Sequence, residues 1–273
     1  MSFELIALLL TLCVAGGIAG LTAGLFGNGG GFVVVPALLA VFDVFTEATS
    51  EIIYVAIGTS LASIVISSAR SVQAHARRGA VDFEVLRDWA LWLVIGAGIG
   101  LYIASIVDGR SLFIVFATGV LGYSVYFLFP GLFGSGSISD TMPSGLGRAS
   151  LASFLGGFSA LLGIGGGTIT VMTMTLCNRT VHQAVATASG VGLIIGLSGA
   201  LGFLYLGWGA SDLPFGSVGY INVPALAAIS AISIFTAPLG AKWAHSLNDV
   251  HLKRLFGVYL VIVSLSMYYK AIG

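Results

Sequence analysis

Two glycine clusters are the residues of this sequence best suited to chemistry. One lies at residues 27–31 (GNGGG) and the other at residues 163–167 (GIGGG). Consecutive glycines destabilise a helix by about 1 kcal/mol each and leave backbone N–H groups without partners inside the helix. At the start of a helix such groups carry partial positive charge, which suits an anion such as a carboxylate or a sulfonate. The alternative is that the glycines only allow helices to pack closely.

Hydroxyl side chains near the clusters extend this candidate site. A serine or threonine hydroxyl can coordinate an oxyanion without the cost of burying a full charge. For each hydroxyl the alternative is an ordinary hydrogen bond to a carbonyl of the preceding helical turn. The predicted substrate-binding residues are Asn28, Gly29, Gly30, Gly31, Thr59, Ser60, Ser63, Gly165, Gly166, Gly167, Thr168, Thr187 and Ser189.

Two further features bear on how an anion could be handled. Asn28 stands where the second cluster has Ile164, and its amide could bond either substrate oxygens or a neighbouring carbonyl. Arg70 could supply positive charge to a pathway, or its guanidinium could extend to the membrane surface. No Asp or Glu lies well inside an apolar segment, so the sequence lacks the acidic relay that proton-coupled transporters often use.

Composition indicates a membrane protein. Of 273 residues, 57% are hydrophobic and 8% are charged, with a mean hydropathy of +1.04. That is too little charge to coat a soluble globule. The formal net charge is zero and the longest basic tract is two residues, so a nucleic-acid partner is not expected. Cys13 and Cys177 are far apart without metal-ligand spacing, so neither a metal nor another cofactor is predicted.

Apolar segments punctuated by polar or glycine-rich residues predict an all-α membrane protein, a polytopic helical bundle of about ten segments. The segments are 3–26, 31–46, 51–74, 89–107, 111–133, 149–163, 167–178, 181–207, 219–241 and 251–272. Residues 131–148 are rich in Gly, Ser and Pro and are typical of a linker. The predicted organisation is a first transmembrane repeat over 1–130, this linker, and a second repeat over 149–273.

The two halves resemble each other in sequence and differ in charge. The glycine clusters match, and AIGTS at 56–60 aligns with AVATA at 184–188, which indicates a duplicated five-segment unit. The most basic loop of the first half, at residues 77–87, and that of the second half, at residues 253–254, should both face the cytoplasm. They occupy different positions in the repeat, so equivalent loops of the two halves lie on opposite sides of the membrane. The units are therefore expected to be inverted relative to one another. The two segments around each glycine cluster could be two full spans or a re-entrant hairpin. Both arrangements leave an odd number of crossings in each half, so both are compatible with inverted units.

An enzyme is a remote alternative. Ser198 lies in a GLSG sequence like the GxSG motif of rhomboid intramembrane proteases, and His245 lies in a later segment. A serine and a histidine at suitable depth could perform acyl transfer. GxSG arises easily by chance in a chain with 39 glycines, and it would leave the repeat unexplained.

Several stretches together resemble the sulfite exporter TauE/SafE family, also called toluene sulfonate uptake permeases. They are the paired glycine clusters with their β-branched continuations, HARRGAVD at 75–82, and the stretch 219–257. The resemblance implies a multi-pass transporter in a prokaryotic plasma membrane that exports sulfite, small organosulfonates or related anions and has no enzymatic activity. Its partners would be a small anionic substrate and the lipid bilayer, and a homodimer is left open. Alternating access around the glycine clusters is the expected mechanism, with an anion channel as the alternative.

Overall fold

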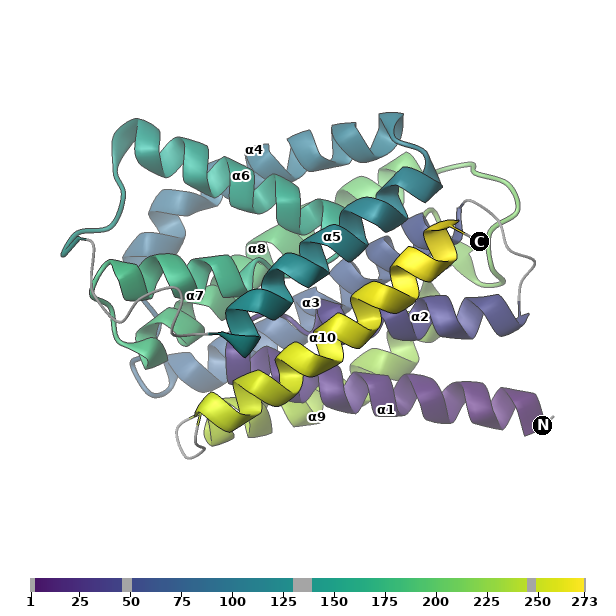
Figure 1. Ribbon diagram of the computed structural model, residues 1–273, viewed down its shortest axis with the longest axis horizontal. Coiled ribbons are helices and arrows are strands. Elements are labelled where there is room, and N and C mark those ends of the chain that lie inside the picture. Colours follow the sequence, from purple (N-terminus) through teal and green to yellow (C-terminus); the bar gives the residue numbers. More distant parts are fainter. Residues whose placement is uncertain (1–2, 46–50, 130–138, 245–248, 273) are drawn as a thin grey trace.

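The structure, a computed structural model, describes residues 3–45, 51–129, 139–244 and 249–272 (Figure 1). Over these ranges the chain forms ten helices and one short hairpin of strands, as predicted for an all-α membrane protein. Helices α1, α3, α4, α8 and α9 are long and apolar enough to cross a membrane. The elements are α1 (Phe3–Phe26), α2 (Gly31–Phe45), α3 (Ile52–Ala76), α4 (Phe83–Ile106), α5 (Gly109–Leu128), α6 (Gly145–Leu162), α7 (Gly167–Leu176), α8 (Val181–Leu206), β1 (Ser217–Val218), β2 (Ile221–Asn222), α9 (Val223–Trp243) and α10 (Asp249–Ile272).

Most helix boundaries agree with the apolar segments, and the differences have local causes. Helix α4 begins six residues before the predicted segment because Asp82 caps it, accepting a hydrogen bond from the Val85 N–H at 3.1 Å. Helix α6 begins at Gly145, so the last four residues of the expected linker 131–148 are helical. Residues 130–138 of that region lie outside the described part of the chain. Helix α9 begins four residues late because the β1–β2 hairpin precedes it.

The main helix pairs cross between the two halves. Helix α1 packs on α9, α4 packs on α6, α3 packs on α8, and α5 packs on α10. Glycine allows the close approach: a Cβ on Gly24 would lie 2.2 Å from the Ala237 carbonyl oxygen, and one on Gly100 would lie 2.4 Å from the Gly157 carbonyl oxygen. Each half thus supplies one helix to every pair, so the halves are interlocked.

The segments around each glycine cluster form helical hairpins, each with a short second helix. Helices α2 and α7 have 15 and 10 residues, giving lengths of about 22 and 15 Å at 1.5 Å per residue. Both are short against a hydrocarbon core of about 30 Å. Helices α1 and α2 enter from one end of the bundle, and α6 and α7 enter from the opposite end (Figure 1). The chain turns back at each cluster, and α1 is itself long enough to cross a membrane, so the choice between full spans and re-entrant segments stays a prediction. Residues 27–31 are here called the first tip and residues 163–167 the second tip.

Arginines gather at one end of the bundle, called the basic end, which holds the N-termini of α4, α6 and α8 and the C-termini of α3 and α9 (Figure 1). Its contacts are Arg148 with Asp88 at 2.5 Å, Arg179 with Asp82 at 3.7 Å, and the Arg78 guanidinium donating to the Ala241 carbonyl at 3.0 Å. These contacts join helices of both halves, so the basic end is held together across the interface between them.

Aromatic residues close the opposite end. The Tyr220 hydroxyl, in the β1–β2 hairpin, donates to the Glu51 carboxylate, and its ring stacks on Tyr54 with centroids 5.3 Å apart. The Tyr54 hydroxyl donates to the Val107 carbonyl at 2.6 Å. Burial raises the pKa of Tyr220, and its hydrogen bond to Glu51 and the charge of Glu51 raise that pKa further. Tyr220 therefore stays protonated and can hold Glu51 at neutral pH.

Candidate functional site

The two tips meet in the interior, backbone against backbone. The Gly165 N–H donates to the Asn28 carbonyl at 3.2 Å. A Cβ on Gly31 would lie 2.2 Å from the carbonyl oxygen of Gly163, and a Cβ on Gly167 would lie 2.2 Å from the carbonyl oxygen of Gly27. The contact is reciprocal, because each tip places its helix-starting glycine on the first carbonyl of the other.

Glycine is needed at the tips for conformation as well as for space. Gly29 and Gly30 have φ angles of 74° and 83°, and Gly163 and Gly166 have φ angles of 63° and 65°. This left-handed region is open to glycine and costly for other residues. Helix α6 ends through Gly163, whose N–H and that of Ile164 bond back to Ala160 and Ser159. Both clusters therefore interrupt their helices.

The tips lie at half the depth of the bundle and are buried. A Cβ on Gly29 would touch Ile64, which is midway along α3, and one on Gly165 would lie 3.2 Å from Cα of Gly192, midway along α8. Every residue from 27 to 31 and from 163 to 167 is buried. Unwound backbone at this depth is tolerated only where protein surrounds it or where it lines a cavity.

Several buried polar side chains around the tips have no hydrogen-bond partner among the described residues. Among them are the Asn28 amide nitrogen, the Ser68 hydroxyl and the Thr168 hydroxyl, in residues that are 1%, 1% and 5% exposed. The Ser159 hydroxyl, whose Oγ would lie 3.0 Å from a Cβ on Gly166, belongs to the same set. The Asn28 orientation is fixed because its Oδ1 accepts from the Gly30 N–H at 3.1 Å. Ser68 faces the second tip, since a Cβ on Gly192 would lie 2.9 Å from the Ser68 Oγ and 3.2 Å from the Gly165 oxygen. Buried donors left unpaired cost about 1–3 kcal/mol each, so such a cluster suggests a missing ligand.

Helix α3 holds both tips through its serines. The Ser60 hydroxyl donates to the Gly163 carbonyl of the second tip at 2.8 Å, and Ser67 donates to the Gly29 carbonyl of the first tip at 3.0 Å. Ser63 donates to the Ser60 carbonyl of its own helix at 2.8 Å, which is the ordinary structural role. Of the predicted hydroxyls on α3, Ser60 is therefore the one that the structure brings to a tip.

Thr59 and Thr187 do not join the cluster, contrary to the expectation from sequence. Their hydroxyls accept backbone N–H groups at helix starts, from Asn222 before α9 at 2.8 Å and from Asp82 before α4 at 2.9 Å. These threonines are equivalent in the aligned halves, and each supports the fourth helix of the other half. Ser189 is also occupied, because it shares a hydrogen bond with Ser71 at 2.8 Å. The physical reason is that an unpaired backbone N–H at a buried helix start needs an acceptor.

Arg70 is directed away from the tips. Its Nε donates to the Ile234 carbonyl of α9 at 3.4 Å, and its guanidinium also donates to Gln73 at 2.6 Å. It thus joins α3 to α9, and its role as a pathway charge stays a prediction. Ser198 donates to the Ile194 and Ile195 carbonyls of its own helix, and His245 lies outside the described residues. Over the described ranges no group of three or more His, Cys, Asp or Glu could hold a metal ion.

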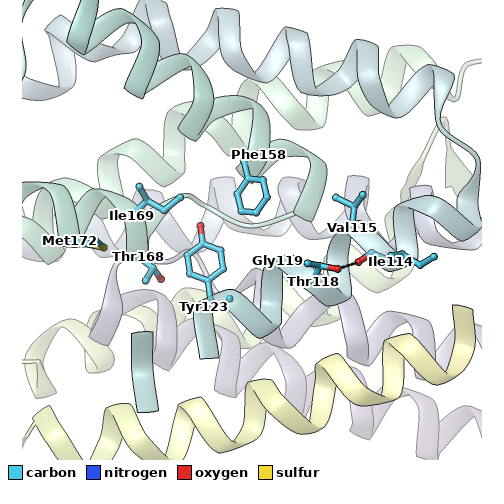
Figure 2. A pocket seen from close by; sticks show the side chains of 10 residues that line it. Ile114, Val115, Thr118, Gly119, Tyr123, Phe158, Thr168, Ile169 and Met172 are labelled. Atoms are coloured by element: carbon cyan, nitrogen blue, oxygen red, sulfur yellow. Dashed lines mark hydrogen bonds between the residues drawn. The ribbon is translucent and has the colours of Figure 1, made fainter. Parts of the chain in front are cut away.

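A cavity of about 470 Å³ lies between α5, α6 and α7, next to the second tip (Figure 2). Its wall is mostly apolar, with Phe158, Ile169 and Met172, and it includes Thr168 directly after the tip. Figure 2 shows the Tyr123 hydroxyl pointing between Ile169 and Phe158. A hollow with a few polar groups in an apolar wall is the usual form of a small-molecule site.

Sequence reasoning missed Tyr123 as a lining residue and did not single out Ser68 among the serines of α3. Tyr123 lies in an apolar segment without any neighbouring polar pattern, so nothing in the sequence marked it. Ser68 follows Ser67 directly, and a helix points such neighbours about 100° apart. That spacing could have shown that only one of them can bond to the first tip.

Comparison with known proteins agrees with this architecture. Residues 12–267 match the family described as sulfite exporter TauE/SafE. A probable membrane transporter protein of Haemophilus influenzae is 33% identical over 95% of this chain and 98% of its own length. A probable membrane transporter protein of Methanocaldococcus jannaschii is 28% identical over 98% of both chains. No solved structure matches. The chain therefore belongs to the sulfite exporter TauE/SafE family, and it is a multi-pass protein of a membrane transporter family.

Proposed function

We propose that the protein transports a small anion, namely sulfite, a small organosulfonate or a related organic anion, and binds it where the two tips meet. The observation that carries this proposal is the set of unpaired donors Asn28, Ser68 and Thr168 around the unwound backbone. An oxyanion bound at the tips would supply the acceptor that these donors lack among the described residues. The family description, sulfite exporter, supports the choice of anion and the outward direction.

The electrostatics of the tips favour an anion as well. Helices α2 and α7 begin at Gly31 and Gly167, so their positive ends both point to the middle of the bundle. Paired half-helix N-termini at the membrane midplane recur as anion sites in transporters built from repeats. Here the cost of interrupting two helices is offset when the freed N–H groups contact a ligand.

We propose alternating access by two inverted units, 1–130 and 149–273, joined by the linker 131–148. Because both tips are buried, a substrate can reach them only if the surrounding helices move. The reciprocal glycine contacts and the Thr59 and Thr187 pattern support two equivalent units. Contacts at the basic end and the Glu51–Tyr220 contact at the opposite end would each have to open in turn.

The proposed location is a prokaryotic plasma membrane, with the basic end in the cytoplasm. Arg77, Arg78, Arg87, Arg148 and Arg179 flank this end. An excess of Lys and Arg in short loops marks the cytoplasmic side of a membrane protein. Relatives named as membrane transporters in a bacterium and an archaeon support the prokaryotic setting.

Proteoliposomes loaded with sulfite or methanesulfonate test this proposal. We expect efflux that saturates with concentration and is accelerated by the same anion outside. The reason is that a carrier must turn its binding site back to the inner side before each new turnover. The Ser68→Ala, Thr168→Val double variant should raise the half-saturating concentration, whereas the control Ser105→Ala, Ser150→Ala, altering two exposed hydroxyls, should match the wild type. Conductance without saturation or exchange would show a channel, and absence of any anion flux would refute the proposal.

A further inference from the structure

We infer that the site between the tips takes an oxyanion group with a single negative charge and discriminates against a group with two. This inference rests on the proposed function, because it specifies the charge of the substrate at the same site. It follows from which donors surround the tips and from where the cations of the protein are held.

The side-chain donors at the tips are all neutral. Asn28 offers an amide, and Ser68 and Thr168 offer hydroxyls, each buried and without a partner among the described residues. Such groups bind an oxyanion by hydrogen bonds and contribute no formal charge. Three such donors match in number the three oxygens of a sulfonate or sulfite group.

Five of the described arginines make contacts away from the tips. Arg70 on α3 lies three residues from Ser67, which bonds to the first tip, but its guanidinium is directed to α9 and Gln73. The other arginine contacts join groups at the basic end: Arg78 with the Ala241 carbonyl, Arg87 and Arg148 with Asp88, and Arg179 with Asp82. None of these contacts places a guanidinium on a tip.

The positive charge at the tips therefore comes from the helix termini. Each helix N-terminus acts as roughly +0.5 of an elementary charge, so α2 and α7 together supply about one positive charge. That balances one negative charge. A second negative charge would be buried at low dielectric without compensation, and removing an ion from water without a partner is strongly unfavourable.

This charge balance predicts which candidate ligands the site binds, according to the number of negative charges that they carry. Methanesulfonate and other sulfonate groups carry one charge at any pH near neutral, and so does sulfite in its singly protonated form. Sulfate and fully deprotonated sulfite carry two charges on a group of similar size. The site should therefore favour the first set although the oxygen geometry of the two sets is nearly the same.

Binding to the purified full-length protein tests the inference by calorimetry or by the ligand-dependent rise in melting temperature at constant ionic strength. Methanesulfonate should bind at least about tenfold more tightly than sulfate. The apparent affinity for total sulfite should fall as pH rises through its second ionisation. Methanesulfonate, whose charge is constant over that range, controls for titration of the protein itself.

Substitutions distinguish an effect on ligand binding from an effect on the charge preference. Thr168→Val should weaken methanesulfonate binding but leave the preference over sulfate unchanged, because it removes a donor and no charge. Sulfate binding as tightly as methanesulfonate, or sulfite affinity that rises with pH, would overturn the charge inference while leaving the proposed function standing. If no oxyanion bound or was transported, the proposed function itself would fail.

Discussion

The two hairpin tips share glycines with positive φ at their first and fourth positions and differ in one side chain. Both end a helix at a glycine with positive φ, both start the next helix at a glycine, and each presses that glycine on a carbonyl of the other. The second residue of the tip, however, is Asn28 in the first half and Ile164 in the second. Ile164 is buried in the hydrophobic core, whereas Asn28 keeps an unpaired amide nitrogen.

This difference separates packing from chemistry. The glycines at 31 and 167 are explained by the 2.2 Å that a Cβ would leave to the opposite carbonyl, so they require no ligand. The close-packing alternative that the sequence left open is therefore true of these two glycines. Anion binding depends instead on Asn28, Ser68 and Thr168, which the packing leaves unpaired.

The largest effect is expected where the tips are equivalent. Gly31→Ala and Gly167→Ala each force a methyl group onto a backbone carbonyl and should destabilise the fold by about 3 kcal/mol or more. Both should lower the melting temperature of the purified protein by similar amounts. Gly98→Ala is the control, because no atom lies within 4 Å of its added methyl group. A melting temperature equal to that of the wild type for either tip variant would contradict the reciprocal contact.

Where the tips differ, a change of charge should stop transport. Asn28→Asp keeps the oxygen that accepts from the Gly30 N–H but replaces the free donor by negative charge. Repulsion of the bound anion should reduce binding by about a hundredfold, equivalent to about 2.8 kcal/mol. Radiolabelled anion uptake measures this reduction. Gln73→Glu, at an exposed position where the side-chain oxygen accepts from Arg70, is the matched control, and an equal loss in both variants would contradict the role of Asn28.

The equivalent threonines should affect stability and leave binding unchanged. Thr59→Val and Thr187→Val remove the acceptors of the Asn222 and Asp82 N–H groups and should cost about 1–2 kcal/mol of unfolding free energy. Thr59→Val should cost more, because Asn222 is buried while Asp82 is partly exposed. Thermal unfolding gives the order, and ligand titration of the folded variants should give wild-type affinity. A selective loss of affinity would place these hydroxyls at the anion after all.

The smallest effect is expected at Thr168. Thr168→Val removes a buried hydroxyl that has no partner in the described structure, so folding should lose nothing or gain slightly. Anion affinity should fall about threefold to tenfold, the range of one neutral hydrogen bond. Reduced affinity with an unchanged or raised melting temperature confirms a ligand role. Lower stability with unchanged affinity would show that Thr168 is structural.

Much of the fold could be predicted from the sequence because membrane helices are set by apolar length. Helices α1, α2, α7 and α8 begin at the predicted residues, and glycine or threonine marks the boundary of the last three. Helix α4 was misjudged at its start because its first turns carry charged residues that belong to the basic end and are still helical. The partners of each helix could not be predicted, since the pairing of α1 with α9 and of α4 with α6 depends on surfaces far apart in the chain.

The candidate site was predicted less well than the fold. Glycine clusters are visible in sequence, but a hydroxyl on a helix looks the same whether it serves a cap, a tip or a ligand. Thr59 and Ser60 are adjacent, yet one supports the start of α9 and the other bonds to the second tip. Only the arrangement of both halves decides which hydroxyl is left without a partner.

Chemical access to the tips tests the central claim most directly. In a Cys13→Ala, Cys177→Ala background, Ser68→Cys places the only cysteine beside the second tip. A small anionic methanethiosulfonate reagent should modify this cysteine from the aqueous phase, and methanesulfonate should slow the modification in a saturable way. If the cysteine stays unmodified while the protein is actively transporting, or if no transported anion protects it, the substrate does not bind where the two hairpins meet.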